Sequence, residues 1–519
     1  MSARRTASGA LAGSVAAAAA LAAGQVPAAV SGDTIDPVTA VGNEVVDRYA
    51  ASLKDVAVAL FGQGDKLALV VGIVVTSLLL GAALGILALH RLTLGAAGIV
   101  GFGAAGFAAQ ALDPSASTGL AATSATCGVA AGVATLVVLV RMLDHQRASA
   151  APRRPSADDP AARPGDRRSF LLATGGVAAV AALTGLGAHA IRGRSRIAAQ
   201  RAALVLPEPL RAASLPGDTL SVAGISPYFT PTEDFYRIDT ALVTPQVDAG
   251  SWRLRVTGLV DRPFGITFDE LLAMDVVEEP VTLACVSNEV GDDLVGNAVW
   301  LGVPLTSLLE RARPQPAATQ IVGRSTDGFT AGFPTSLAGD GRVALVAFGM
   351  NGEPLPAAHG YPARLVVEGL YGYVSATKWL TEIELTRFED FDAYWVPRGW
   401  SKLGPIKTQS RIDVPSDRAT VAAGTVAVGG VAWAPGRGID RVELQVDDGP
   451  WQEAELAGAS DDSTWAQWLV RWDAAPGEHV LRCRATDGTG EVQTAARRDP
   501  RPDGATGHHT IRITVRPGD

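Results

Sequence analysis

One of the cysteines, Cys285, lies at a position where its thiolate could take part in chemistry. The sequence holds three, and Cys285 closes the apolar run Val281–Cys285, a predicted strand, just before a polar segment. A lone cysteine is most often a small buried hydrophobe, which is how we interpret Cys127 and Cys483. A thiolate at the end of a strand also suits a soft, redox-active metal. Three cysteines exclude a disulfide scaffold and a four-cysteine zinc site.

Short motifs rich in basic, aromatic and polar residues lie on both sides of Cys285. Arg364 precedes the apolar run Leu365–Val367, where an unpaired charge at the edge of a buried strand would be costly. Taken singly, such charges are ordinarily solvated. Their order makes the set specific: Asp234–Asp239, Leu283–Asn288, Asn297–Val303, Ser325–Phe329, Met350–Pro356, His359–Val367, Tyr371–Tyr373 and Lys378–Leu380. This set, within residues 220–518, resembles the sulfite oxidase family of molybdopterin enzymes.

The resemblance implies a Mo-molybdopterin cofactor, in which one pyranopterin supplies a dithiolene to one molybdenum and a protein cysteine adds a thiolate. Cys285 matches that metal ligand. The pterin carries a phosphate, for which arginine offers a planar fork and lysine a point charge. The cofactor-binding residues implied are Phe235, Tyr236, Arg237, Cys285, His359, Arg364, Ser375, Thr377 and Lys378. Those expected to be catalytic are Cys285, Arg237 and Tyr236.

Asp239 departs from the family's pattern. Well-known sulfite oxidases carry a histidine two positions after the arginine that Arg237 matches, the one that faces the molybdenum and receives an anionic substrate. A carboxylate there would repel sulfite, and the net charge of −9 points the same way. An internal salt bridge between Asp239 and Arg237 is an equal alternative. The expected substrate is a small oxyanion or an S- or N-oxide, and the direction of oxygen transfer stays open.

The electrons are expected to pass to or from a separate protein, because the sequence has no Cys-x-x-Cys-His haem motif and no iron–sulfur cysteine cluster. The isoelectric point near 5.4 argues against a nucleic-acid partner. Two other functions remain open. One is a methionine-sulfoxide or other S- or N-oxide reductase, and the other is a non-catalytic cell-surface binding protein with a degenerate molybdenum domain.

Two predicted domains make up the second part of the chain. Residues 215–410 read as a mixed α+β molybdopterin domain, with strands at Trp252–Gly258 and Arg364–Val367 and a helix at Leu305–Ala312. Residues 411–518 show alternating strands and hairpin turns, which favours an immunoglobulin-like β-sandwich. The resemblance implies that this sandwich forms a homodimer. The sequence alone equally allows a carbohydrate- or protein-binding module.

The first part of the chain is apolar and predicts membrane helices. Five stretches lack any charged residue, and each is long enough to cross the ~30 Å hydrocarbon core. They are 6–32, 67–89, 92–112, 114–140 and 169–191. We therefore expect a four-helix membrane region at 1–141, a cytoplasmic linker at 142–168 and a fifth membrane helix at 169–191.

Loop charges predict the orientation. Arginines gather before the first stretch and in the predicted linker, whereas acidic residues fill the loop after the first stretch. Positive loops stay inside, so five spans place the catalytic domain outside the cytoplasm of a multi-pass plasma-membrane protein. The first stretch could instead be a cleaved signal peptide. Arg167-Arg168 resembles a twin-arginine export signal, although paired arginines are also common in cytoplasmic loops.

Overall fold

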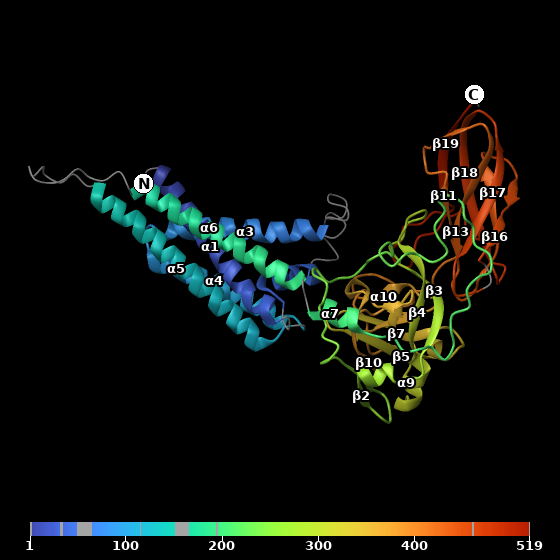
Figure 1. The fold of residues 1–519 in the computed structure, drawn as a ribbon, viewed down its shortest axis with the longest axis horizontal. Helices are drawn as coiled ribbons and strands as arrows, with labels where there is room; N and C mark the ends of the chain where they lie inside the picture. The colour runs from blue at the N-terminus through green and yellow to red at the C-terminus, as the bar shows by residue number, and fades with distance from the viewer. Residues whose placement is uncertain are drawn as a thin grey trace, which may run out of the picture. The chain divides into compact units, whose positions relative to one another are not determined.

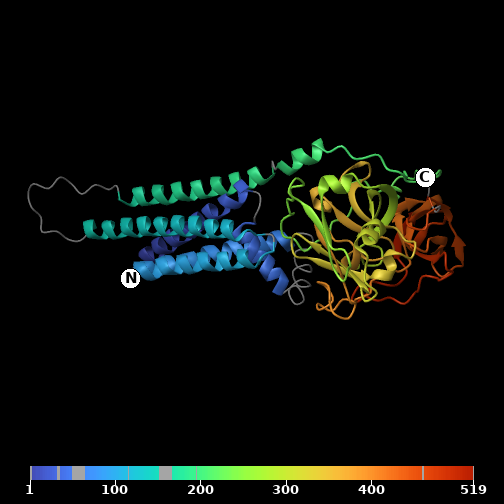
Figure 2. The ribbon, with the colours of Figure 1, turned by 90° about the horizontal axis from the view of Figure 1, so that it is seen from below.

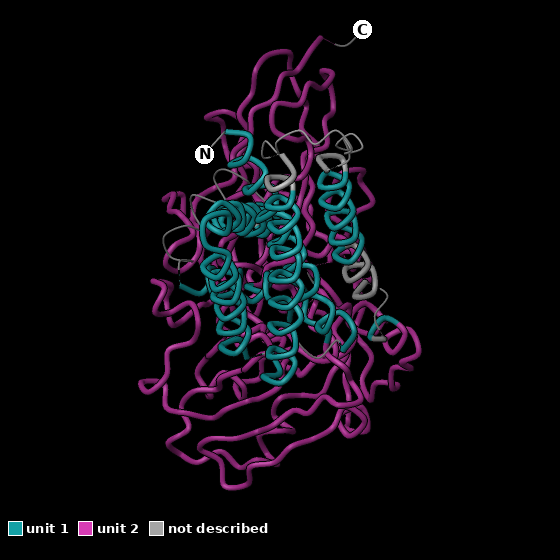
Figure 3. Tube along the Cα trace, turned by 90° about the vertical axis from the view of Figure 1, so that its left-hand side faces the viewer, with its two compact units in different colours: residues 1–198, 240–246 teal, residues 199–239, 247–519 magenta. Residues whose placement is uncertain are grey.

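The computed structural model describes residues 3–31, 35–48, 65–114, 116–150, 166–193, 196–458 and 461–517. They form two compact units (Figure 3). Unit 1 holds residues 1–198 together with Thr240–Gln246, and unit 2 holds Ala199–Asp239 and Val247–Asp519. Each unit is described by itself below.

Unit 1 consists of long helices that run side by side (Figures 1 and 2). They are α1 (Ala3–Ser31), α3 (Asp65–Ala88), α4 (Leu92–Leu112), α5 (Thr118–Ala150) and α6 (Asp166–Gly193). A shorter helix over residues 37–48 begins behind Asp36, whose carboxylate accepts from the backbone N–H groups of Val38 and Thr39. Among the described residues, four helices are long and apolar enough to cross a membrane, namely Ala3–Ser31, Lys66–Ala88, Leu92–Leu112 and Thr118–His145.

The first helix packs inside unit 1 rather than along its surface. Half of its most apolar window is buried, compared with 11% for that of α3. Glycines allow this close packing, because Gly9 and Gly13 of α1 face Gly81 and Gly85 of α3. A Cβ on Gly85 would overlap the carbonyl oxygen of Gly9 and would lie 2.6 Å from the Gly13 nitrogen. Such small-xxx-small pairs are a common means of close helix association in lipid.

The ends of two elements differ from the predicted boundaries. Helix α5 continues through Ala150, well into the segment predicted as a linker, because no proline or glycine follows Gly132 until Pro152. Residues 151–165 of that segment lie outside the described residues, and its last three residues belong to α6. In α6, the apolar part with described side chains is Ser169–Gly185, shorter than the four candidate spans, although the helix itself has 28 residues.

The first part of unit 2 contains one mixed sheet, one antiparallel sheet and short helices (Figure 1). One sheet has the strand order β2-β1-β10-β5-β6, and the other has β3-β4-β7-β8 with β9 also paired to β7. The elements, after α7 (Arg196–Ala203), are β1 (Arg253–Gly258), β2 (Phe264–Thr267), α8 (Phe268–Leu272), β3 (Val277–Ala284), β4 (Val295–Pro304), α9 (Leu305–Ala312), β5 (Gln320–Ser325), β6 (Thr330–Pro334), η2 (Thr335–Ala338), β7 (Ala344–Met350), β8 (Glu353–Pro354), η3 (Ala357–His359), β9 (Arg364–Val367), α10 (Gly372–Ser375) and β10 (Leu380–Thr386).

The second part of unit 2 is built from two further sheets that share one apolar core. Their strand orders are β11-β13-β17-β16 and β12-β19-β18-β14-β15. The bounds are β11 (Gln409–Val414), β12 (Thr420–Ala422), β13 (Gly424–Trp433), β14 (Ile439–Val446), β15 (Trp451–Glu453), β16 (Glu455–Ala457), β17 (Ala466–Ala474), β18 (Gly477–Asp487) and β19 (Thr510–Arg516). The region is thus a β-sandwich, and its predicted immunoglobulin-like type stays a prediction.

The tryptophans of this sandwich divide between two cores. Trp468 and Trp472 of β17 fill the sandwich itself. Trp433 and Trp465 instead join the buried cluster of the first part of unit 2. Apolar burial therefore continues across the predicted domain boundary at residue 410, which ties the sandwich to the domain before it.

We predict that Gly85→Leu destabilises unit 1, because a side chain at this position meets the backbone of α1, which cannot move aside. Overpacking of this kind costs about 1–3 kcal/mol or more. Gly72→Leu is the matched control on the same helix, since nothing lies within 4 Å of a Cβ placed there. Thermal unfolding of both variants in detergent, followed by far-UV circular dichroism, should show a lower midpoint for Gly85→Leu alone. Equal midpoints would contradict the packing described.

Candidate cofactor and substrate site

The segment with Phe235, Tyr236 and Arg237 has little regular structure, and asparagine side chains hold its start. Asn297 of β4 donates from Nδ2 to the carbonyl oxygen of Tyr228 (2.9 Å). Asn351 follows β7 and donates to the carbonyl oxygen of Thr230 (3.0 Å). Asn351 adopts a left-handed φ of +50°, which asparagine tolerates better than most residues. Two strands of the β3–β4–β7 sheet thus fix the entry to the segment.

Cys285 is buried directly after β3, as its position at the end of an apolar run predicts. Its backbone N–H donates to the Leu294 carbonyl oxygen (2.9 Å), and its Sγ accepts from the Ser287 N–H (3.4 Å). The sulfur therefore stands at the neck of a loop that joins β3 to β4. Burial raises the pKa of Tyr236 and of Tyr371, and a negative charge on Cys285 adds to both shifts, so both phenols lie within its electrostatic reach.

Two predicted cofactor residues, Arg364 and His359, lie side by side and buried. Arg364 begins β9, and its Nη1 donates to the carbonyl oxygen of His359 (3.2 Å). Its guanidinium carbon lies 5.0 Å from the centroid of the Trp300 ring. Burial lowers the pKa of Arg364 to about 10, and the pKa of His359 falls to about 4 for the same reason, with Arg364 and Lys378 adding repulsion. His359 is therefore neutral at pH 7.

Asp239 forms ion pairs with two basic side chains. Its Oδ2 lies 3.0 Å from Arg237 Nε and 3.2 Å from Lys378 Nζ. The Asp239 side chain is 5% exposed and that of Lys378 is 10% exposed, whereas that of Arg237 is 41% exposed. Burial lowers the pKa of Lys378 to about 8, although Asp239 opposes the shift. The alternative that Asp239 makes a salt bridge with Arg237 thus agrees with the geometry.

Aromatic rings connect these groups. Phe235 is buried, stacks on Tyr236 (centroids 5.2 Å apart), and meets Trp300 and His359 edge to face, each at 5.7 Å. Tyr236 is half-buried, and the loss of solvent around its hydroxyl raises its pKa. The positive charge of Arg364 opposes this rise in the Tyr236 pKa, so the buried arginine lies close enough to act on the phenol.

Two predicted residues direct their hydroxyl groups elsewhere. Ser375 donates to the carbonyl oxygen of Tyr371 (3.1 Å) inside its own turn, and Thr377 donates to that of Gly323 (3.4 Å) in β5. Neither hydroxyl is aimed at the cluster of basic side chains. A contact to a cofactor from this segment would therefore come from its backbone.

Three residues that support the site had no role predicted from the sequence, although each lies in one of the motifs that resemble the sulfite oxidase family. Trp300 offers its ring to Arg364. Trp379 has a left-handed φ of +48° and donates from Nε1 to the Ala357 carbonyl oxygen (2.8 Å), which fixes the neighbouring Lys378. Asp327 is a buried carboxyl whose pKa is raised by burial and by Asp239. The sequence did hold a signal for them, because these aromatic and acidic residues lie in the motifs that match the family.

The donor set fits a pterin phosphate and a thiolate-bound metal. Within the described residues, Nδ1 of His359 is buried and has no hydrogen-bond partner. Arg364 is buried and donates hydrogen bonds to the carbonyl oxygens of Leu365 and His359, so its charge still has to be matched by an anion. The described part of the chain holds no cluster of three or more histidine, cysteine or acidic side chains suited to a metal. A metal at this site would therefore depend on Cys285 and on the pterin.

The protein-family model described as "oxidoreductase molybdopterin binding domain" matches residues 241–395 of this chain. An "uncharacterized oxidoreductase", YuiH of Bacillus subtilis, is 33% identical over 175 residues, which cover 33% of this chain and 84% of that protein. The chain belongs to the sulfite oxidase family of molybdopterin oxidoreductases. The cofactor that this family implies is Mo-molybdopterin.

Longer relatives in the sulfite oxidase family match about half of the chain. Mitochondrial sulfite oxidase of Rattus norvegicus is 28% identical over 315 residues, 51% of this chain and 57% of that protein. The chain thus spans little more than half the length of that relative. Sulfite oxidase of Arabidopsis thaliana is 28% identical, with 52% and 83% covered. The sulfane dehydrogenase SoxCD from Paracoccus pantotrophus has the same fold over 57% of this chain and 86% of its own, with a TM-score of 0.50 and 23% identity.

We predict that His359 makes the cofactor-free protein less stable in acid. Its pKa is about 4 when folded and 6.5 when exposed, so between these values the unfolded chain binds a proton that the folded chain does not. The free energy of unfolding should fall by about 2–3 kcal/mol from this group as the pH drops from 7 to 4.5. His509, with the same shift, adds a similar loss.

The measurement is guanidinium unfolding followed by tryptophan fluorescence, because all ten tryptophans follow residue 251 and so report on unit 2. His359→Gln should lose less stability than the parent between pH 7 and 4.5. An equal loss in both proteins would show that the His359 ring takes up a proton without opposing the fold.

Proposed function

We propose that the protein is a membrane-anchored oxidoreductase that transfers an oxygen atom to or from a small oxyanion or an S- or N-oxide, outside the cytoplasm. The observation that carries this proposal is that Arg364, Lys378 and Arg237 lie near the same buried histidine, His359, which Phe235 connects to a half-buried tyrosine near Cys285. When bound, the molybdenum cofactor supplies two-electron chemistry coupled to the transfer of one oxygen atom. Cys285 is proposed as the protein ligand of the metal, since a thiolate suits it.

The basic side chains are assigned two roles. Arg364, His359 and Lys378 would hold the pterin phosphate: Arg364 and Lys378 through charge, and the neutral His359 through a hydrogen bond. Arg237 is more exposed than these, so it is proposed to bind and orient an incoming anionic oxygen. Tyr236, with its raised pKa, keeps its proton at pH 7 and can donate one hydrogen bond near the thiolate. The Phe235 ring stacks on that of Tyr236 and meets His359 edge to face.

Asp239 is proposed to tune the affinity for anions rather than to exclude them. Because its single negative charge is shared between Arg237 and Lys378, the group of Arg237, Lys378, Arg364 and Asp239 still carries net positive charge. An anion can therefore approach, with weaker attraction than a histidine in this place would allow. The relatives named as sulfite oxidases and as a sulfane dehydrogenase support a sulfur-containing substrate for this chain.

Electrons are proposed to leave or enter through a separate redox protein. Membrane anchoring rests on the four candidate spans, with α6 proposed as a fifth. A helix of 28 residues is about 42 Å long, which exceeds the ~30 Å hydrocarbon core. The number of spans decides the side of the catalytic domain, because four would return it to the side of the N-terminus. Helix α1 packs within unit 1, which supports its retention rather than cleavage as a signal peptide.

Three further features belong to the proposal. The β-sandwich is proposed to be immunoglobulin-like and to mediate a homodimer, as the family resemblance implies. Arg167-Arg168 is proposed as an internal twin-arginine signal at the start of α6. A reductase acting on methionine sulfoxide is the second candidate function, and it is favoured if Arg237 proves unnecessary for turnover.

Cys285→Ser tests the metal ligand. A serine hydroxyl is a hard, poor ligand for molybdenum, and it changes the volume of the site little, so turnover should be abolished while the fold is kept. Cys483→Ser is the control, since Cys483 is also buried but lies in the sandwich core. The measurements are molybdenum content and dye-linked turnover with sulfite, sulfoxides and N-oxides. Activity of Cys285→Ser within a few-fold of the parent would refute the assignment.

Asp239→Asn tests the substrate class. The amide can still accept a hydrogen bond from Arg237, but the negative charge is gone, so kcat/KM for sulfite should rise about tenfold by relief of repulsion. Turnover of a neutral sulfoxide should change little. Asp340→Asn serves as the control, because Asp340 pairs with Arg342 in a separate ion pair. If anionic and neutral substrates respond alike to Asp239→Asn, the carboxylate acts on structure and the charge argument is wrong.

A further inference from the structure

Hydrogen bonds within the backbone and to the Asn288 side chain close the loop that follows Cys285. Leu294 donates from its N–H to Asn288 Oδ1 (2.8 Å), and its carbonyl oxygen accepts from the Cys285 N–H. The two ends of the loop, Cys285 and Leu294, are thus tied together. The middle of the loop, residues 289–293, extends away from this tie and needs support from elsewhere.

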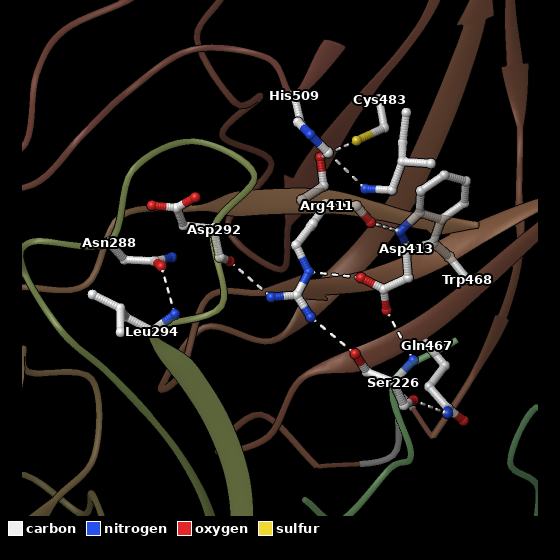
Figure 4. A network of polar contacts seen from close by, with 12 residues as sticks. Ser226, Asn288, Asp292, Leu294, Arg411, Asp413, Gln467, Trp468, Cys483 and His509 are labelled. Atoms are coloured by element: carbon white, nitrogen blue, oxygen red, sulfur yellow. Dashed lines mark hydrogen bonds and ion pairs between the residues drawn. The ribbon is translucent and has the colours of Figure 1, made fainter. Parts of the chain in front are cut away.

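Arg411 of the sandwich supplies that support (Figure 4). Its Nη1 donates to the carbonyl oxygen of Asp292 in the loop (2.8 Å). Its Nη2 donates to Ser226 Oγ (2.9 Å), and its Nε pairs with Asp413 Oδ1 (2.6 Å). The side chains of Arg411 and Asp413 are 11% and 8% exposed, so these charge-assisted bonds are shielded from water. One guanidinium therefore joins the loop, the segment before Phe235 and strand β11.

His509 covers the loop beside Arg411. A Cβ on Gly291 would overlap the His509 ring, so the ring lies directly against the loop backbone at a position with φ of +95°. The ring is held in turn, because its Nδ1 accepts from the Ile412 N–H (3.0 Å). A residue with a side chain at position 291 could not pack in this way, which is a physical reason for glycine there.

The sandwich also holds the strand before Cys285. Thr282 of β3 donates from its N–H to the Ser463 carbonyl oxygen (2.9 Å), and its Oγ1 accepts from the Trp465 N–H (2.8 Å). Strand β3 is the edge of its sheet, so the first of these bonds uses a backbone N–H that the sheet leaves open, and the second uses the Thr282 side chain. Contacts from the sandwich therefore lie on both sides of Cys285, three residues before it and seven after it.

We propose that the β-sandwich completes the molybdenum site, with Arg411 and His509 as positioning residues that hold the Cys285 loop in its ligating conformation. This inference rests on the proposed role of Cys285 as metal ligand. It differs from a dimerisation role, because the contacts come from the same chain and end at the loop that carries the ligand. Neither residue is proposed to touch the substrate.

The first experiment uses the full chain without cofactor and measures alkylation of Cys285 by iodoacetamide, read by mass spectrometry of its peptide. The buried thiol reacts only when the loop opens, so the rate reports the open population. Arg411→Lys keeps a charge but loses the three-way fork, and a lost charge-assisted bond should raise the rate about tenfold. His509→Asn keeps an acceptor for Ile412 and removes the ring, and it should act in the same direction.

Two controls separate positioning from general unfolding. Cys483 is buried in the sandwich core, so its alkylation in the same samples reports whether the sandwich itself has loosened. Arg484→Lys removes the guanidinium of another sandwich arginine, one paired with Glu443. The expected result is faster alkylation of Cys285 with Cys483 unchanged, and parental rates in Arg484→Lys. The proposal fails if Cys285 keeps the parental rate in Arg411→Lys, or if both thiols become reactive together.

The second experiment uses the protein made in a host that supplies the cofactor. Arg411→Lys should bind less molybdenum and give an altered Mo(V) electron paramagnetic resonance spectrum, because the ligand geometry changes. An unaltered spectrum at full occupancy would overturn the positioning role. If the parent protein itself binds no molybdenum, the proposed function fails, while the alkylation rates still decide whether the sandwich holds the loop.

Discussion

Buried positive charge beside a cysteine is the constraint on which the rest of the structure depends. Arg364 is almost fully buried, Lys378 nearly so, and the hydrogen bonds of Arg364 end on carbonyl oxygens. Such charges are tolerated where an opposite charge completes the site, and Asp239 pairs with Lys378 and Arg237. A bound phosphate would supply the remaining negative charge. The basic side chains repel one another, so the surrounding fold has to hold them in place while no anion is bound.

Rigid supports around the charged groups meet this requirement. Trp300 lies across the Arg364 guanidinium, and Trp379 fixes Lys378 through an unusual backbone conformation. The asparagines Asn297 and Asn351 pin the segment that leads to Arg237. In each case a buried side chain of a strand or turn fixes a less regular segment, so the accuracy of the site is set by the two sheets rather than by the loops.

The sequence predicted local features of the fold, but it did not predict contacts between residues that are far apart in the chain. Strand β9 and helix α9 have the predicted bounds, because Arg364–Val367 is a short apolar run and Leu305–Ala312 has one apolar face. The pairing of Asp239 with Lys378 joins residues far apart in the sequence, so no local pattern could reveal it. The hydroxyl directions of Ser375 and Thr377 were equally hidden, because matching a motif identifies a residue without its rotamer.

In the predicted membrane region, the composition predicted the apolar helices but could not predict which of them is most buried. The charge-free stretches look alike, yet α1 is the most buried of the candidate spans, and this follows from which glycines face one another across α1 and α3. The helix over residues 37–48 was not predicted either. Its N-terminal cap, Asp36, was noted only as one of the acidic residues in a loop.

The match to the molybdopterin-binding family covers residues 241–395, and the site that we propose extends beyond these limits on both sides. Arg237 and Asp239 lie before this range, and Arg411 and His509 lie after it. The boundary at residue 410 follows the change from mixed structure to strands, yet Trp433 and Trp465 cross it to fill the core of the preceding domain. If Cys285 is the thiolate ligand, its sulfur would have to be held at the metal that the pterin carries, so small movements of its loop would matter. A sandwich that shares a core with the catalytic domain and binds both sides of Cys285 can resist such movements, which a separate domain on a flexible linker could not do.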